Sequence, residues 1–440
     1  MEFSWQKNLF AVLITTTVLT VVISFTLQNK NNFTIQTATV SSNVLATTSN
    51  TQNSASQIPL APISPPPPQK LSNPPKIIKS VYVTGYSAGA KNYLKYLSNL
   101  FKNTEINAVV VDIKGSDGYV TYASGAEDVK KYNLTNYAIP DIDALVRFFH
   151  DQNIYVIGRI AVFEDPQYAK ARPDFAIYDK AKTAESPEPS RRVLWKDNNG
   201  LSWLDPASKD VWSYDVLLAK DAFYNGFDEV NFDYVRFPTD GNAENMGFPV
   251  YDEKITKADT IKTFFQYVRS SLPEEKISVD LFGLTTVNAD DMGIGQIIEN
   301  AFENFDYISP MVYPSHYANG FIGFSNPAEY PYEVIKYSMD SALEKERNFL
   351  KQKQDLLIKN SEAAGSPASL AQALIPATVF APLAKFRPWL QDFNMGADYT
   401  ADMVKAEIKA TQDSLGGDYV GFMLWNPSNI YTQNAVLRPN

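Results

Sequence analysis

Two aspartates, Asp233 and Asp280, are the residues whose type and position point most directly to chemistry. Asp233 lies in the run EVNFDY at residues 229–234, and Asp280 in the run ISVDLF at residues 277–282. A carboxyl group inside so apolar a segment is costly to desolvate, which favours a functional role. Two carboxyl groups across a glycosidic bond are the machinery of glycoside hydrolysis. The structural alternatives are an ion pair of Asp233 with Arg236, and a loop-capping role for Asp280.

Strand alternation indicates where Asp233 points. In an extended strand Asp233 shares a face with Glu229 and Asn231, opposite the apolar Val230 and Phe232. If the apolar face packs on helices, Asp233 points into the mouth of a barrel. We therefore expect Asp233 to be the nucleophile or charge stabiliser.

The fifth predicted strand supplies the second carboxyl group. Adjacent strands lie about 4.8 Å apart, so Asp280 and Asp233 could approach one another. We expect Asp280 to be the general acid/base. A short separation of the two would suit retention of configuration and a longer one inversion. Arg236 follows Asp233 closely in the sequence and is expected to hold its carboxylate ionised.

Polar and aromatic residues follow most of the other apolar runs, which is how a protein holds a ligand rich in hydroxyl groups. The candidate substrate-binding residues are Asp112, Lys114, Glu164, Arg236, Tyr313, His316, Trp389, Asp392 and Trp425. Asp112 and Lys114 are two residues apart, so we expect them to share a strand face, where they either pair or bind hydroxyl groups. Asp112, Glu164 and Asp392 are reserve candidates for the acid.

The elements that must position these residues begin near Ser80. From there, short β-branched or aromatic runs alternate with amphipathic stretches, as in a parallel sheet. The predicted strands are residues 81–86, 108–113, 154–160, 229–234, 277–282, 307–312, 386–391 and 419–425. The pattern predicts an α/β fold, a (β/α)8 TIM barrel with its active site at the C-terminal ends of the strands. Residues 373–380 are an alternative seventh strand.

Amphipathic stretches between these runs predict the helices. They cover residues 92–101, 141–150, 205–224, 259–271, 332–360 and 401–414, with a surface loop at 361–369. Asp205 and Pro206 form a helix-start signal, an N-cap followed by proline at the first helical position. Gly226 is the expected stop.

The N-terminal part of the chain predicts a tether. Residues 9–27 carry no charge and are long enough to span a bilayer as a transmembrane helix. They predict a signal anchor, with a cleaved signal peptide and a secreted protein as the alternative. Residues 31–76 are rich in Ser, Thr, Asn and Pro and predict a disordered linker. We thus expect an anchor at 1–30, a linker at 31–76 and a barrel at 77–440, held outside the cytoplasm at the cell membrane.

Composition excludes several function classes. The net charge is −10, which argues against a nucleic-acid partner. The chain has no Cys and only two His, His150 and His316, so a thiol nucleophile, a Ser-His-Asp triad and a His-rich metal site of a deacetylase are disfavoured. We expect no cofactor and no metal, a polysaccharide or oligosaccharide substrate, and a monomer.

Four segments carry a family resemblance. They are GFDEVNFDYVRFP at 226–238, VVDIK at 110–114, WLDP at 203–206 and PWLQDF at 388–393. Together they resemble the bacterial family of domain of unknown function 4015, a putative glycoside hydrolase domain, over about residues 77–428. The resemblance implies a TIM-barrel, glycosidase-like protein that is usually exported.

Two further similarities bear on mechanism. The segment with Asp228, Asn231 and Asp233 is similar to the chitinase pattern DxxDxDxE, but Val235 stands where the catalytic Glu should be. The departure argues against substrate-assisted chitin hydrolysis. Asp233, in the fourth predicted strand, is also similar in position to the nucleophile of α-amylase-like and α-galactosidase-like barrels, at the level of fold only. The leading hypothesis is a cell-surface glycoside hydrolase, and the alternative is a non-catalytic glycan-binding protein of the cell envelope.

Overall fold

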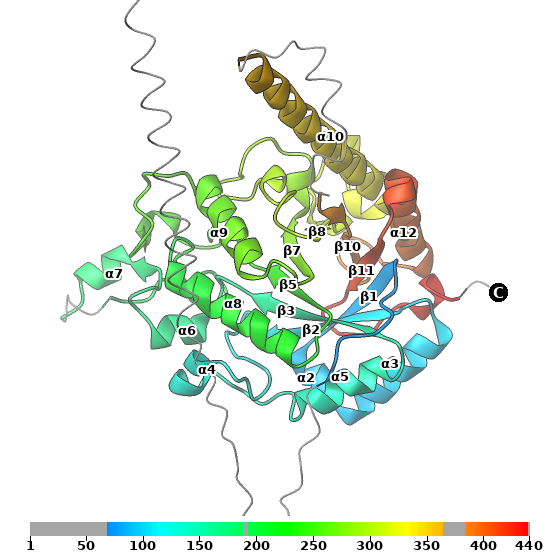
Figure 1. The fold of residues 1–440 in the computed structure, drawn as a ribbon, viewed down its shortest axis with the longest axis horizontal. Coiled ribbons are helices and arrows are strands. Elements are labelled where there is room, and N and C mark those ends of the chain that lie inside the picture. The colour runs from blue at the N-terminus through cyan, green and yellow to red at the C-terminus, as the bar shows by residue number, and fades with distance from the viewer. Residues whose placement is uncertain (1–67, 188–191, 364–382, 439–440) are drawn as a thin grey trace, which may run out of the picture. The chain divides into compact units, whose positions relative to one another are not determined.

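Eight parallel strand positions close into a barrel in the computed structural model, which describes residues 68–187, 192–363 and 383–438 (Figure 1). The strands are β1 (Ile78–Val83), β2 (Ala108–Lys114), β3 (Tyr155–Ala161), β5 (Glu229–Asp233), β7 (Ile277–Phe282), β8 (Tyr307–Met311), β9 (Lys385–Phe386), β10 (Trp389–Gln391) and β11 (Gly421–Trp425). β10 pairs with both β8 and β11, and β11 pairs with β1, which closes the sheet. The predicted (β/α)8 barrel is confirmed.

Helices surround the strands (Figure 1). They are α2 (Gly85–Gly89), α3 (Lys91–Asn103), α4 (Glu127–Tyr132), α5 (Ile142–His150), α6 (Pro166–Ala171), α7 (Lys180–Ala184), α8 (Lys209–Tyr224), α9 (Lys257–Ser271), α10 (Pro331–Ala363) and α12 (Ala401–Leu415). Two short strands, β4 (Tyr178–Asp179) and β6 (Met246–Gly247), pair outside the barrel. Among the described residues no helix is both long and apolar enough to cross a membrane. The predicted anchor at residues 9–27 lies outside the described residues.

Burial on both faces explains why the strands read as continuous apolar runs. All seven residues of β2, for example, are buried. The larger apolar cluster contains alternate strand residues such as Val109, Val111 and Val230, together with helix residues such as Leu100 and Phe264. A smaller cluster of strand residues fills the barrel interior. Parallel strands covered on both faces need this composition.

The bounds of β1 and α8 differ from the sequence-based expectation. β1 lies three residues earlier than predicted, and it ends before Thr84, whose side chain caps the start of α2. α8 starts at Lys209 and not at Asp205, whose carboxylate instead accepts hydrogen bonds from the backbone N–H groups of Ala207, Val250 and Tyr251. Asp205 therefore ties two loops together.

The seventh strand is split into β9 and β10. Pro388 lies between them and has no N–H to donate to a ladder. The alternative seventh strand at 373–380 lies outside the described residues. α10 runs to Ala363, so the first residues of the predicted 361–369 loop are helical, and the rest of that loop is not described.

A short segment before β1, residues 68–77, lies against the N-terminal end of the barrel; we call it the N-terminal strap. Leu71 packs on the interior cluster, and its N–H donates to Asp228 Oδ1 at 2.6 Å. Asp228 Oδ2 in turn binds Val156 N at 2.7 Å and His150 Nε2 at 2.9 Å. Most of this segment belongs to the predicted linker, yet its described residues contact the barrel, which belongs to one compact unit, Pro65–Asn440.

Candidate active site

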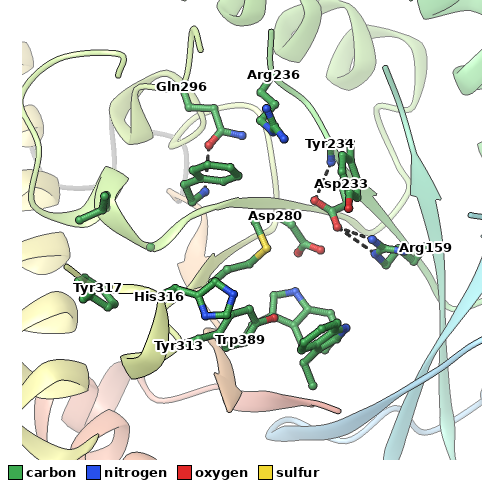
Figure 2. Close-up of a pocket in the computed structure, with 15 residues that line it drawn as sticks. Arg159, Asp233, Tyr234, Arg236, Asp280, Gln296, Tyr313, His316, Tyr317 and Trp389 are labelled. Carbon is green, nitrogen blue, oxygen red and sulfur yellow. Dashed lines mark hydrogen bonds and ion pairs between the residues drawn. The ribbon is translucent and has the colours of Figure 1, made fainter. Parts of the chain in front are cut away.

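A cavity of about 400 Å³ opens at the C-terminal ends of the strands (Figure 2). Its lining residues come from six barrel strands and the loops that follow them: Arg159, Asp233, Tyr234, Arg236, Asp280, Phe282, Gly283, Leu284, Gln296, Met311, Tyr313, His316, Tyr317, Trp389 and Trp425. This is the end of a TIM barrel at which active sites form. Of the residues expected from the sequence, Asp233, Asp280, Arg236, Tyr313, His316, Trp389 and Trp425 lie here.

Both carboxylate oxygens of Asp233, the last residue of β5, are held by the protein. Arg159 donates from Nε and Nη2 to Oδ2, at 3.0 and 2.5 Å. The backbone N–H of Tyr234 donates to Oδ1 at 2.6 Å. Tyr234 has a φ of +54°, a left-handed conformation that is costly for an aromatic residue and is found mainly where the surrounding structure enforces it. The orientation of Asp233 is therefore fixed.

Arg159 joins Asp233 to a second carboxylate. Its Nη1 donates to Asp112 Oδ1 at 2.6 Å, and the Tyr82 hydroxyl donates to Asp112 Oδ2. Burial disfavours a charged guanidinium, but Asp112 and Asp233 outweigh burial and raise the pKa of Arg159. Asp112 thus positions Arg159 and is not among the cavity-lining residues.

The sequence-based expectation that Arg236 holds Asp233 is wrong. Arg236 Nη2 donates to Asp240 at 2.7 Å, and Asp233 is bound by Arg159 instead. Arg159 was not recognised from the sequence. The available signal was a charged residue at the centre of the apolar run of β3, between Gly158 and Ile160.

Asp280 lies next to Asp233 on the neighbouring strand. Phe232 pairs with Val279, so the following residues, Asp233 and Asp280, are the next positions of this parallel register. The Asp280 side chain is 1% exposed, and its Oδ1 accepts a hydrogen bond from Asn231 Nδ2 at 2.8 Å.

The surroundings of Asp280 favour its protonated form. Burial, followed by the negative charge of Asp233, raises its pKa well above the usual value, against the opposing effect of Asn231 and Arg159. Asp280 can therefore carry a proton at a pH where an ordinary aspartate has lost it. A buried carboxyl group with a raised pKa, beside a second carboxyl group that is bound by a guanidinium, is suited to act as a proton donor.

Glu164, a reserve candidate for the acid, is buried and is not among the residues that line the cavity. Burial and the nearby Asp197 raise its pKa to about 8, against the opposing effect of Arg236. Its Oε2 has no hydrogen-bond partner among the described residues. Asp197 is anchored by the Trp203 indole N–H at 3.0 Å.

Asp112 and Lys114 do not share a face, contrary to expectation. The register of β2 against β3 shifts between them, as in a β-bulge, which turns Lys114 out of the barrel. Lys114 is fully buried and pairs with Asp165 and Asp215 at 2.9 and 2.8 Å. It therefore lies outside the cavity lining, in a structural ion pair.

Asp392 also has a structural environment. Its carboxylate accepts hydrogen bonds from the backbone N and the hydroxyl of Thr432, at 2.8 and 2.6 Å, and so fastens the C-terminal loop to the barrel. Burial raises its pKa to about 6. Asp392 is not among the residues that line the cavity.

Aromatic side chains form one wall of the cavity. The Trp425 ring lies 5.6 Å from that of Tyr313 and 5.0 Å from that of Phe393, while Trp389 packs edge-on against Tyr82. In the view of Figure 2, Asp233 and Asp280 lie between Trp389 and Tyr313 on one side and Arg236 and Gln296 on the other. Among the described residues no group of His, Asp and Glu has the arrangement of a metal site. Apolar rings beside carboxyl groups suit a sugar, which has both C–H faces and hydroxyl groups.

Comparisons with known proteins identify a family. The sequence model of the DUF4015 family, described as a putative glycosyl hydrolase domain, matches residues 80–359 and 368–431. A hypothetical protein from Ruminiclostridium thermocellum ATCC 27405 is 36% identical, with 49% of this chain and 98% of that chain covered and a TM-score of 0.41. No curated protein matches.

A second solved structure shows the fold alone. The glycoside hydrolase domain of PgaB (BpsB) from Bordetella bronchiseptica is 11% identical, with 83% of this chain and 100% of that chain covered and a TM-score of 0.52. At that identity the likeness supports the barrel and says nothing of the substrate.

Proposed function

This chain belongs to the DUF4015 family of putative glycosyl hydrolase domains, and on that premise we propose that it hydrolyses a polysaccharide with Asp233 and Asp280 as its paired carboxyl groups. One observation carries the proposal. Two aspartates on neighbouring strands line one cavity, one bound by a guanidinium and the other buried with a raised pKa.

The two environments assign the roles. Asp233, bound by Arg159, is suited to stabilise the positive charge that develops on the sugar, or to attack it. Asp280, protonated by its surroundings, is suited to donate a proton to the departing glycosidic oxygen. The two aspartates lie on neighbouring strands, whose backbones are about 4.8 Å apart, and the separation of their carboxyl groups would decide between retention and inversion.

We place the activity at the cell surface. The support is the uncharged run at residues 9–27, followed by the Ser/Thr/Pro-rich segment at 31–76. A barrel tethered in this way would meet polymers of the envelope or its surroundings.

A non-catalytic glycan-binding function is the second candidate, and one observation favours it. Both oxygens of Asp233 already accept hydrogen bonds, from Arg159 and from Tyr234 N. A carboxylate so fully engaged is a weaker nucleophile than a free one.

Hydrolysis of a panel of bacterial cell-wall and exopolysaccharides tests the proposal. The protein should begin at Pro65 so that the N-terminal strap is retained. Asp233→Asn and Asp280→Asn are the test variants, and Asp252→Asn, in an exposed loop, is the matched control. Release of reducing ends by the parent and the control, with a loss on the order of 10²–10⁴ in both test variants, would support the proposal.

Other results would contradict the proposed function or change the roles assigned to the two aspartates. Equal release by the parent and Asp233→Asn would remove Asp233 from the chemistry. Binding without release from any substrate would support the glycan-binding function. The anomeric configuration of the first product, followed by NMR, would separate retention from inversion.

A further inference from the structure

Arg236 is an unusually buried cation in the cavity wall. It is 5% exposed and lines the cavity beside Gln296 (Figure 2). The centre of its guanidinium lies 4.7 Å from the Trp203 ring, 5.0 Å from the Phe282 ring and 5.9 Å from the Tyr234 ring. Aromatic faces attract a cation and hold its plane in place. Arg236 is therefore a preorganised positive charge within the site.

The protein only partly satisfies this guanidinium. Nη2 donates to Asp240 at 2.7 Å, and Nη1 makes a long contact of 3.4 Å with the Phe237 carbonyl. A guanidinium has five N–H donors, so the others have no acceptor among the residues described. The Asp240 side chain is 52% exposed, which makes it a partner that can move into solvent.

Neighbouring carboxyl groups do not supply the missing negative charge. Burial and Asp197 raise the pKa of Glu164 to about 8, so at neutral pH this group is mostly uncharged. Burial and the charge of Asp233 raise the pKa of Asp280, and Asp233 is bound by Arg159. Among the described residues Asp240 is the one carboxylate that pairs with Arg236, so the other N–H donors of the guanidinium are available to a ligand in the cavity.

We propose that Arg236 binds an acidic group of the substrate, so that the site takes a sugar acid in preference to a neutral sugar. This inference rests on the proposed function and adds the substrate class to it. A carboxylate can accept two parallel hydrogen bonds from a guanidinium, an arrangement that lysine or an amide cannot provide. Asp240 would give up its contact to the incoming acid.

Binding of matched sugars tests the inference without requiring hydrolysis. The probes are glucuronic acid against glucose, galacturonic acid against galactose, and N-acetylmuramic acid against N-acetylglucosamine. The uronic acids carry a carboxylate where their neutral partners carry the C6 hydroxymethyl group, and N-acetylmuramic acid carries an additional O-linked lactyl group with a carboxylate. Binding to the purified full-length chain is followed by saturation-transfer NMR and by intrinsic tryptophan fluorescence, to which Trp389 and Trp425 in the cavity lining contribute.

The expected result is that at least one acid binds roughly tenfold or more tightly than its neutral partner. In Arg236→Gln that ratio should fall to about one. In Asp240→Asn it should rise, because a competing carboxylate is removed while the exposed loop is left in place. The two variants act in opposite directions, which a general loss of folding cannot reproduce.

Two results would overturn the inference and are distinguishable. Binding of neutral sugars as tight as that of every acid would refute the acid preference and leave the proposed function standing. Failure of all the sugars to bind would count against the sugar site itself, and so against both proposals.

Discussion

Arg159 donates two hydrogen bonds to a single carboxylate oxygen of Asp233 and a third to Asp112. One guanidinium on β3 thereby fixes a carboxylate on β5 and is itself fixed by a carboxylate on β2. The arrangement uses the planar fork of arginine, which no other side chain offers.

Arg159→Lys should therefore impair activity more than stability. Lysine keeps the positive charge but cannot reach both aspartates with the same geometry, so Asp233 loses its fixed orientation. We expect kcat to fall by about 10–10², measured by steady-state kinetics beside urea unfolding. The conservative Arg172→Lys, in an exposed ion pair, is the control. Unchanged kcat in Arg159→Lys would show that the orientation of Asp233 does not limit the reaction.

Asp280 should set the alkaline limb of the pH–rate profile. Its pKa is raised by burial and by Asp233, and the acid must be protonated to act. kcat/KM should therefore fall as the pH rises through that raised pKa. Asp280→Asn should lower the hydrolysis of ordinary glycosidic bonds on the order of 10²–10⁴ and remove this limb.

Activated aryl glycosides provide the control for Asp280, because a good leaving group needs no proton. Asp280→Asn should lose far less activity on them. An equal loss on both substrate types would contradict the role of proton donor.

Glu164→Gln should become increasingly stabilising as the pH rises. The folded pKa of Glu164 is about 8, above its usual 4.5, so the native state retains a proton that the unfolded chain releases. The stabilising contribution of protonated Glu164 is complete below the pKa of the unfolded chain. It is lost as the pH rises through the higher pKa of the folded protein. Glutamine has nearly the same shape and does not titrate, so its contribution to stability does not vary with pH.

Urea unfolding measures this difference. Between about pH 5 and pH 8 the stability of Glu164→Gln relative to the parent should grow by roughly 2–4 kcal/mol. Glu185→Gln, on the surface, is the matched control. A difference that does not vary with pH would mean that Glu164 is ionised in the native state.

Lys114→Met should destabilise the fold without acting on the site. It leaves Asp165 and Asp215 buried without their cation, which costs about 3–5 kcal/mol. KM should stay close to that of the parent, because Lys114 is not among the residues that line the cavity. A large rise in KM with an unchanged free energy of unfolding would instead indicate that Lys114 contributes to substrate binding.

The sequence alone determined the barrel and the position of its two principal carboxyl groups. Apolar runs that alternate with amphipathic stretches specify parallel strands, and the period-two alternation of β5 places Asp233 on the interior face. Both patterns lie within single segments of the chain, so they can be recognised without knowing which segments pair. The same reading found the aromatic residues Tyr313, Trp389 and Trp425 at the strand ends.

Only the tertiary structure decided which cation pairs with which carboxylate. Arg236 is close to Asp233 in sequence but turns to Asp240, whereas Arg159, from another strand, reaches Asp233. A bulge in β2 separates Asp112 from Lys114 in the same way. Strand register and bulges arise from pairing between distant segments, and a shift of one residue reverses the face on which a side chain lies.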